Sequence, residues 1–187
     1  DFKPGSCTAI LGETGAGKTT LVRMLLALLS PQEGEVEIYD ARHNETLTPR
    51  HRCNFVYVPQ GNTLLSGTIR ENLRLGKLDA TDEEMYEALH TSCADFVKSL
   101  PLGLNTLCSE QGGGLSEGQA QRIAIARSLL RDRAIMLFDE ATSALDPATE
   151  RQLLKNILSN HAKTIIFITH RPAVIDYCDA TLKIEKI

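Results

Sequence analysis

The 187-residue chain lacks several features that mark membrane-spanning, metal-binding or nucleic-acid-binding proteins. No apolar run approaches the ~20 residues that a membrane helix needs, so the sequence predicts no transmembrane segment within it. Its five cysteines show no C-x-x-C pair and no metal-ligand spacing with histidine, which is typical of free thiols in the cytosol. The net charge is −4. Because nucleic-acid surfaces need clustered Lys and Arg, we expect no nucleic-acid partner.

Short apolar runs rich in Val, Ile or Phe recur along the chain, each bounded by turn or helix signals. Such runs are typical of buried parallel strands. We expect these strands at residues 7–11, 55–58, 134–138 and 164–168, and an edge strand at 36–39. Helical patterns lie between them, which indicates an α/β fold with a largely parallel central sheet flanked by helices.

The expected helices carry recognisable start and stop signals. They are residues 18–29 before Pro31, a segment opened by the capping box of Thr81 and Glu84, residues 117–131, and a segment opened by Pro147. The stretch from about 72 to 131 is mostly helical. We therefore expect a helical subdomain inserted into the sheet there.

The stretch GETGAGKTT, Gly12–Thr20, lies between an expected strand and an expected helix and fits the pattern G-x-x-x-x-G-K-[ST]. Glycines let successive backbone N–H groups point at phosphate oxygens, and the following helix directs its positive end at the same anion. Lys18 supplies charge to the β- and γ-phosphates, and the Thr19 hydroxyl can ligate Mg²⁺. The residues expected to contact the nucleotide are Gly12, Glu13, Thr14, Gly15, Ala16, Gly17, Lys18, Thr19 and Thr20. The sequence thus predicts a site for a nucleoside triphosphate.

Two adjacent carboxylates, Asp139 and Glu140, end the apolar run AIMLF. Because side chains alternate along a strand, these two acids cannot play the same role. We expect Asp139 to hold Mg²⁺ through water, and Glu140 to act as a general base or to orient the attacking water.

A second glycine-rich stretch, GGGLSEGQ, places Ser116 and Gly118 at the start of a helix. Ser116 is a natural N-cap, but a cap does not need the surrounding glycines. We interpret this helix start as a second anion-binding site. One ATP cannot contact both sites if they lie on different lobes of the domain. The second site would therefore bind ATP that is held by another copy of the chain.

With these stretches in view, the sequence resembles the nucleotide-binding domain of ATP-binding cassette (ABC) transporters over essentially its whole length. The matching stretches are Gly12–Thr19 for Walker A, IMLFD with Glu140 for Walker B and the catalytic glutamate, LSEGQ (115–119) for the signature, Gln60 for the Q-loop, SALD (143–146) for the D-loop and His170 for the switch histidine. Three stretches, LLSGTIRENL, DEATSALD and THR, further resemble the exporter branch, and SEQGGG (109–114) resembles its X-loop.

The resemblance implies roles for these residues. In the family, the Q-loop glutamine reaches Mg²⁺ and the attacking water, which implies this role for Gln60, and the switch histidine contacts the γ-phosphate, as His170 would here. Two such domains sandwich two ATPs head-to-tail, so Ser116, Gly118 and Gln119 would contact the partner's nucleotide and Asp146 would face the partner subunit. A transmembrane partner domain would hold the protein at the cytoplasmic face of the cell membrane.

Two departures from the family pattern stand out. The family places a pair of strands and an adenine-stacking aromatic before Walker A, whereas only eleven residues precede Gly12 here and Phe2 is too close to it. We therefore expect residues 1–187 to form a domain without its N-terminal strands and without that aromatic. The second departure is Glu117, where the family has glycine; we expect its side chain to turn outward.

The motifs and the resemblance together predict an exporter-type ABC ATPase domain that hydrolyses ATP with Mg²⁺ and powers transport through a transmembrane partner. One alternative is a soluble ABC-type ATPase that acts on nucleic acid, ribosomes or cofactor assembly; the Q-loop neighbourhood and X-loop favour the transporter. The other is a non-hydrolysing nucleotide-gated module, which predicts loss of Glu140 or His170, and both are present.

Overall fold

The computed structural model describes residues 1–13, 15–108, 114–159 and 162–185. The chain divides into two compact units. The first consists of residues 1–56, 133–137 and 161–187, and the second of residues 57–132 and 138–160. Within the described ranges, none of the helices combines the length and apolarity that crossing a membrane requires.

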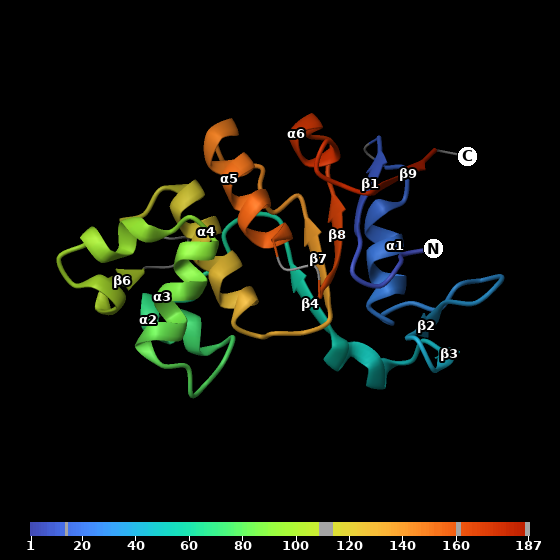
Figure 1. Cartoon of the computed structure of the whole chain (residues 1–187), viewed down its shortest axis with the longest axis horizontal. Coiled ribbons are helices and arrows are strands. Elements are labelled where there is room, and N and C mark those ends of the chain that lie inside the picture. Colours follow the sequence, from blue (N-terminus) through green and yellow to red (C-terminus); the bar gives the residue numbers. More distant parts are fainter. Residues whose placement is uncertain (14, 109–113, 160–161, 186–187) are drawn as a thin grey trace. The chain divides into compact units, whose positions relative to one another are not determined.

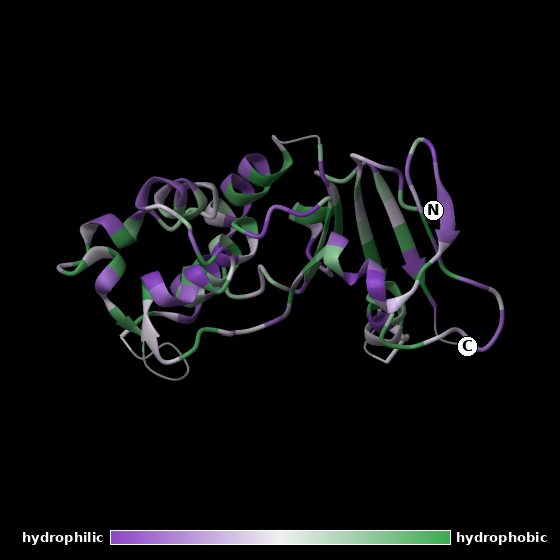
Figure 2. Ribbon diagram, turned by 90° about the horizontal axis from the view of Figure 1, so that it is seen from below, coloured by the Kyte–Doolittle hydropathy of each residue, from purple (hydrophilic) through white to green (hydrophobic). Residues whose placement is uncertain are grey.

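Most of a five-stranded sheet belongs to the first unit (Figure 1). In spatial order its strands are β4 (Phe55–Val58), β7 (Ile135–Asp139), β8 (Thr164–Ile168), β1 (Cys7–Gly12) and β9 (Ala180–Ile184). Strand β1 pairs in parallel with both β8 and β9. The four strands predicted from apolar runs are therefore confirmed, although β4 is only partly buried because Tyr57 on it is exposed. Hydrophobic residues recur along the strands in Figure 2.

The strand β9 was not predicted because its sequence, ATLKI, has no continuous apolar run, and most of its residues are exposed. The predicted edge strand at 36–39 exists, but not in the central sheet. Strand β2 (Glu37–Tyr39) pairs antiparallel with β3 (Asn44–Thr46) in a separate two-stranded sheet. Two mostly exposed three-residue strands of this kind satisfy each other's backbone groups locally.

The helix α1 (Lys18–Leu25) follows β1 and ends earlier than predicted. The expected end at residue 29 was wrong because Ala27 adopts a φ of 51°, in the left-handed region that terminates helices. The guanidinium of Arg52 donates to the carbonyl of Ala27 at 2.6 Å and to that of Leu26 at 2.9 Å. A basic side chain thus satisfies carbonyls that the helix end leaves without backbone partners.

The second unit is mainly helical. Its helices are α2 (Ile69–Arg74), α3 (Asp82–Thr91), α4 (Glu117–Leu129) and α5 (Pro147–Leu158); a short antiparallel pair joins β5 (Gly67–Thr68) and β6 (Leu107–Cys108). The remaining short elements of the chain are α6 (Pro172–Ile175) and the 3-10 helices Pro49–Asn54, Asp95–Ser99 and Gly103–Asn105. The Thr81–Glu84 capping box and the start of a helix at Pro147 are confirmed.

The core of the second unit packs α2, α3 and α4 together. Its fully buried members include Ile69, Leu73, Met85, Leu89 and Ile123. In Figure 2 these helices carry both hydrophobic and hydrophilic residues, as expected for helices with one buried face. Whether residues 72–131 form a subdomain of their own stays a prediction.

Candidate nucleotide-binding site

The predicted phosphate loop connects β1 to α1 in the first unit. Gly15 and Gly17 have φ angles of 85° and 97°, which side chains with a Cβ rarely adopt. The ammonium of Lys18 donates to the carbonyl oxygens of Gly12, at 2.5 Å, and Glu13, at 3.0 Å. The lysine therefore folds back over its own loop, which places its charge beside the loop backbone. Thr14 lies outside the described residues.

Gly12 has a packing role as well. A Cβ at this position would lie 2.9 Å from the carbonyl oxygen of Ile184 on β9. Since β1 and β9 pair at this point, only glycine lets the loop begin this close to its neighbouring strand.

The first turn of α1 keeps its N–H groups available to an anion. Gly17 is the N-cap, and among the described residues no side chain caps this helix. Its first turn also carries no acidic residue, and Thr19 and Thr20 are exposed. Uncapped N–H groups together with the positive helix end are the features that favour an anion at this position.

His170 also belongs to the first unit. It is exposed and lies between β8 and α6, in a turn where the hydroxyl of Thr169 accepts a hydrogen bond from the N–H of Arg171 at 3.0 Å. The turn fixes the backbone on both sides of the histidine.

The second unit brings two of the predicted catalytic residues together. The amide nitrogen of Gln60 donates to a carboxylate oxygen of Glu140 at 3.2 Å. The neighbouring carboxylate, Asp139, instead accepts a hydrogen bond from the hydroxyl of Tyr57 at 2.9 Å. The two acids therefore have different partners, as alternation along the strand predicts. Sequence reasoning missed Tyr57, although its alternation with the buried Val56 and Val58 marks it as outward-facing.

Glu140 has a strained backbone. Its φ of 48° lies in the left-handed region, which costs a residue with a Cβ about 1–3 kcal/mol. The chain turns directly after β7, and the N–H of Ser143 bonds to the Glu140 carbonyl at 3.1 Å. The strain accompanies the position of the carboxylate beside Gln60.

The predicted signature helix, α4, starts with a complete capping box. The Ser116 hydroxyl accepts from the N–H of Gln119 at 3.2 Å, and the Gln119 side chain accepts from the N–H of Ser116 at 2.9 Å. Glu117, the first helical residue, is exposed. Unlike α1, this helix satisfies part of its N-terminus with its own side chains.

The signature helix and the predicted D-loop are in close contact within the second unit. A Cβ at Gly118 would lie 2.8 Å from the carbonyl oxygen of Ala144. The buried Gln121 accepts a hydrogen bond from the N–H of the same Ala144 at 3.2 Å. Two residues one helical turn apart thus lie against one residue of the D-loop, Gln121 through a hydrogen bond and Gly118 through close backbone approach. Gln121 was not among the predicted residues, because a glutamine in a helix carries no distinctive sequence signal.

Asp146 has a local structural role. Its carboxylate caps α5 by accepting from the N–H groups of Thr149 and Ala148, both at 3.1 Å. Hydrogen bonds from Thr149 and Ala148 hold the pKa of Asp146 below its usual range. The side chain is ionised at neutral pH and fixes the end of the D-loop.

Further along α4, Arg127 holds the segment that follows Gln60. Its guanidinium donates to the carbonyl of Thr63 at 2.9 Å and to the Thr63 hydroxyl at 2.6 Å. Burial lowers the pKa of Arg127. The same helix therefore contacts both the Q-loop region and the D-loop.

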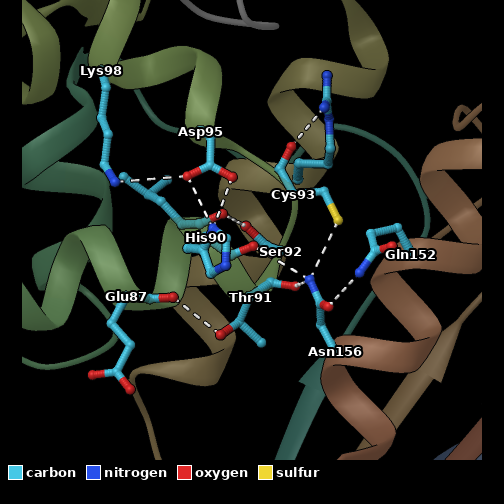
Figure 3. A network of polar contacts seen from close by, with 11 residues as sticks. Glu87, His90, Thr91, Ser92, Cys93, Asp95, Lys98, Gln152 and Asn156 are labelled. Carbon is cyan, nitrogen blue, oxygen red and sulfur yellow. Dashed lines mark hydrogen bonds and ion pairs between the residues drawn. The ribbon is translucent and has the colours of Figure 1, made fainter.

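A polar network ties α3 to α4 and α5 (Figure 3). The amide of Asn156 on α5 donates to the carbonyl of Thr91 at 3.1 Å, at the end of α3. Arg122 on α4 donates to the carbonyl of Cys93 at 2.6 Å. His90 contacts the Asp95 carboxylate at 2.9 Å, close to the same point. These contacts position the helices that carry the signature and the D-loop.

The predicted Mg²⁺ ligands are few and are all oxygen donors. Across the described ranges, no cluster of three or more His, Cys, Asp or Glu side chains could hold a metal ion. Mg²⁺ commonly uses one or two carboxylates together with substrate phosphates and water rather than an all-protein cage. The oxygen donors predicted for it, Thr19, Gln60 and Asp139, fit that chemistry.

A glycine-rich loop between a buried strand and a helix, on a largely parallel sheet flanked by helices, defines a P-loop nucleoside-triphosphate-binding domain. Residues 1–143 match the family described as ABC transporter. A probable ABC transporter ATP-binding/permease protein of Haemophilus influenzae is 40% identical over 189 residues, which cover 98% of this chain and 34% of that protein.

Two further comparisons agree. A mitochondrial iron-sulfur clusters transporter of Kluyveromyces lactis is 40% identical over 97% of this chain and 26% of its own length. A solved structure, that of a bacterial Atm1-family ABC exporter with ATP bound, superposes with a TM-score of 0.86 at 35% identity and covers 98% of this chain and 32% of that one. The chain belongs to the ABC transporter family, as an ATP-binding domain of the exporter type. It spans about a third or less of these relatives' lengths.

Proposed function

We propose that this domain binds ATP with Mg²⁺, hydrolyses it, and powers substrate translocation through a transmembrane transporter domain. The observation that carries the proposal is the contact between Gln60 and Glu140, at 3.2 Å, beside a separately anchored Asp139. The family membership supports it, because the ATP-binding domains of ABC transporters are ATPases coupled to transport.

The phosphates would be held by the loop of the first unit. The uncapped N–H groups at the start of α1 and the loop glycines supply backbone donors. Lys18 would exchange its carbonyl partners on Gly12 and Glu13 for the β- and γ-phosphates. This exchange moves a charge that is already beside the loop, so little side-chain ordering is needed.

Thr19, Gln60 and Asp139 would hold Mg²⁺, with Asp139 acting through water. When bound, the ion neutralises charge on the transferring phosphoryl group. The Tyr57 hydroxyl keeps one Asp139 oxygen engaged and so orients the carboxylate.

Glu140 would accept the proton of the attacking water, and Gln60 would orient both the carboxylate and that water. The left-handed backbone of Glu140, at the turn after β7, accompanies the position of its carboxylate beside Gln60. His170 would contact the γ-phosphate from the turn after β8.

The partners follow from the signature end of the second unit. Ser116, Gly118 and Gln119 would contact ATP held by a second nucleotide-binding domain in a head-to-tail dimer, and Asp146 would face that partner. The relatives that combine ATP-binding and permease parts in one name support a transmembrane partner, which would place this domain at the cytoplasmic face of the membrane.

The substitution Glu140→Gln in the complete transporter tests this proposal. The amide cannot take the proton, so we expect ATP binding within a few-fold of the parent and a turnover at least ~100-fold lower, in the range seen when a catalytic base is lost. Nucleotide binding and steady-state ATPase are measured for the same preparation. The exposed Glu87 on α3 gives a matched control, since Glu87→Gln removes the same charge and should leave both values unchanged. Turnover near the parental rate in Glu140→Gln would refute the role of Glu140.

A further inference from the structure

Two cysteines far apart in sequence meet in the first unit. The Sγ atoms of Cys7 and Cys178 lie 2.8 Å apart, although the residues are 171 positions apart along the chain. Cys7 begins β1, the strand that leads into the phosphate loop, and Cys178 lies between α6 and β9 (Figure 1). Neither residue belongs to the nucleotide site described above.

The backbone holds this pair in place independently of the sulfurs. The N–H of Cys7 donates to the carboxylate of Asp179 at 2.8 Å, and the N–H of Asp179 donates to the carbonyl of Cys7 at 2.9 Å. The pairing continues into the ladder of β1 and β9, where Thr8 lies opposite Ala180. The two thiols are therefore presented to each other by a paired backbone, and joining them requires little movement.

The environment makes the two sulfurs chemically different. Cys7 is buried, with 4% of its surface exposed, whereas Cys178 is half-buried. A hydrogen bond from the Cys7 thiol lowers the pKa of Cys178, while the same contact, together with burial, raises the pKa of Cys7. The half-buried Cys178 is thus the more accessible of the two sulfurs to a small oxidant, and Cys7 lies buried beside it.

The other three cysteines lack this arrangement. Burial raises the pKa of Cys93 and of Cys108. Cys53 is exposed, and its thiol donates to the Arg50 carbonyl at 3.3 Å. Of the thiols in the described part of the chain, only Cys7 and Cys178 are in hydrogen-bond contact with each other.

We propose that Cys7 and Cys178 form a reversible, redox-sensitive disulfide, with Cys178 as the sulfur that reacts with a hydroperoxide and Cys7 as the resolving thiol. The Cys178 thiolate attacks the O–O bond of hydrogen peroxide, which leaves sulfenic acid and, after proton uptake, water. The Cys7 sulfur then attacks the sulfenic sulfur, the S–S bond forms, and the Cys7 proton leaves with the hydroxyl as a second water. Two thiols lose two electrons in total, and one peroxide becomes two waters.

The cross-link would join the strand before the phosphate loop to the segment that leads into β9. In a reducing compartment the pair rests as two thiols, and oxidation is transient. Because the bond closes a loop of about 170 residues, the oxidised chain should be more resistant to unfolding.

The test treats the native chain with hydrogen peroxide, blocks the remaining thiols by alkylation, and maps the peptides by mass. We expect free thiols to fall from five to three, and the peptides carrying Cys7 and Cys178 to be joined with the loss of two hydrogens. A thiol reductant should restore all five. The midpoint of thermal unfolding should rise by about 4–16 °C in the oxidised form.

Two variants sharpen the result. Cys178→Ser should abolish the joined peptide, whereas the matched change Cys53→Ser at an exposed cysteine should leave it at the parental yield. If Cys178→Ser fails to fold, the peptide map of the parent chain decides alone. Two results would overturn the proposal. One is oxidation of Cys178 to sulfinic acid without a link to Cys7. The other is equal alkylation of Cys7 and Cys178 in a sample in which peroxide has already oxidised Cys53.

Discussion

The N-termini of α1 and α4 are both predicted to bind phosphate, yet the two helices differ in whether side chains cap the N–H groups of the first turn. In the described structure α1 has a glycine N-cap in the left-handed region and no side-chain cap. The helix α4 begins with the reciprocal capping box of Ser116 and Gln119 and carries Glu117 in its first turn. An uncapped terminus holds its N–H groups open to an anion, whereas a capped one must exchange an internal hydrogen bond before its capped N–H groups can contact the anion.

From this difference we expect the two helix N-termini to contribute differently to nucleotide binding. The loop before α1 would supply most of the nucleotide affinity, because it combines free donors with the charge of Lys18. The start of α4 would contribute less to affinity and more to sensing a correctly placed phosphate. The hydrogen bond from Ala144 to Gln121 and the close approach of Gly118 to Ala144 link such a contact to the D-loop.

The largest expected effect on ATP binding is at the N-terminus of α1. Lys18→Ala removes a charged donor, and hydrogen bonds to charged groups are worth about 1.5–3 kcal/mol, so ATP affinity should fall by roughly 10- to 150-fold. A binding titration of the isolated chain measures this directly. The exposed Lys155 on α5 provides the control, because Lys155→Ala changes the net charge equally and should leave the affinity unchanged. Unaltered affinity in Lys18→Ala would contradict the phosphate-loop assignment.

An intermediate effect is expected where α4 meets the D-loop. In Gly118→Ala the new methyl group would lie 2.8 Å from the Ala144 carbonyl, so the backbone must shift. Since small misplacements around a reacting centre cost up to about 10²-fold in rate, we expect ATPase in the complete transporter to fall by roughly 10- to 100-fold. ATP affinity of the single domain, measured in parallel, should stay within a few-fold. A loss of affinity as large as that of Lys18→Ala would show that the two termini do not differ as proposed.

The smallest effect is expected at Glu117. A carboxylate near a helix N-terminus stabilises it by ~0.3–1 kcal/mol, and its exposed side chain is consistent with the outward pose expected from the sequence. Glu117→Gly should therefore change the ATPase rate of the complete transporter by less than about tenfold, or 1.4 kcal/mol. The assay is run at low salt, where surface charges are least screened. A much larger acceleration would mean that Glu117 faces the partner's phosphate and weakens this half of the site.

The sequence alone predicted those features that are encoded locally. Glycines and a capping serine located the starts of α1 and α4, and apolar runs located four of the five central strands. The end of α1 was missed because the left-handed turn at Ala27 carries no glycine signal and depends on the distant Arg52. Strand β9 was missed because its residues are mostly exposed.

Contacts between distant segments were the least predictable part of the site. Sequence motifs identified Asp139, Glu140 and Gln60, but not the Tyr57 hydroxyl on Asp139. They also gave no sign that Gln121 would bind the D-loop. The stretch SEQGGG lies almost entirely outside the described residues, so its resemblance to the exporters' X-loop stays a prediction.

The central claim is that Gln60 and Glu140 act as one unit in ATP hydrolysis. A double-mutant cycle on the complete transporter tests it, with Gln60→Ala, Glu140→Asp and the double variant compared by single-turnover ATP hydrolysis at saturating nucleotide. If the pair acts as a unit, the double variant should lose clearly less than the product of the two single losses, with a coupling of about 0.5–3 kcal/mol, or roughly 2- to 150-fold in rate. Losses that multiply within experimental error would show that the two side chains act independently and would contradict the account.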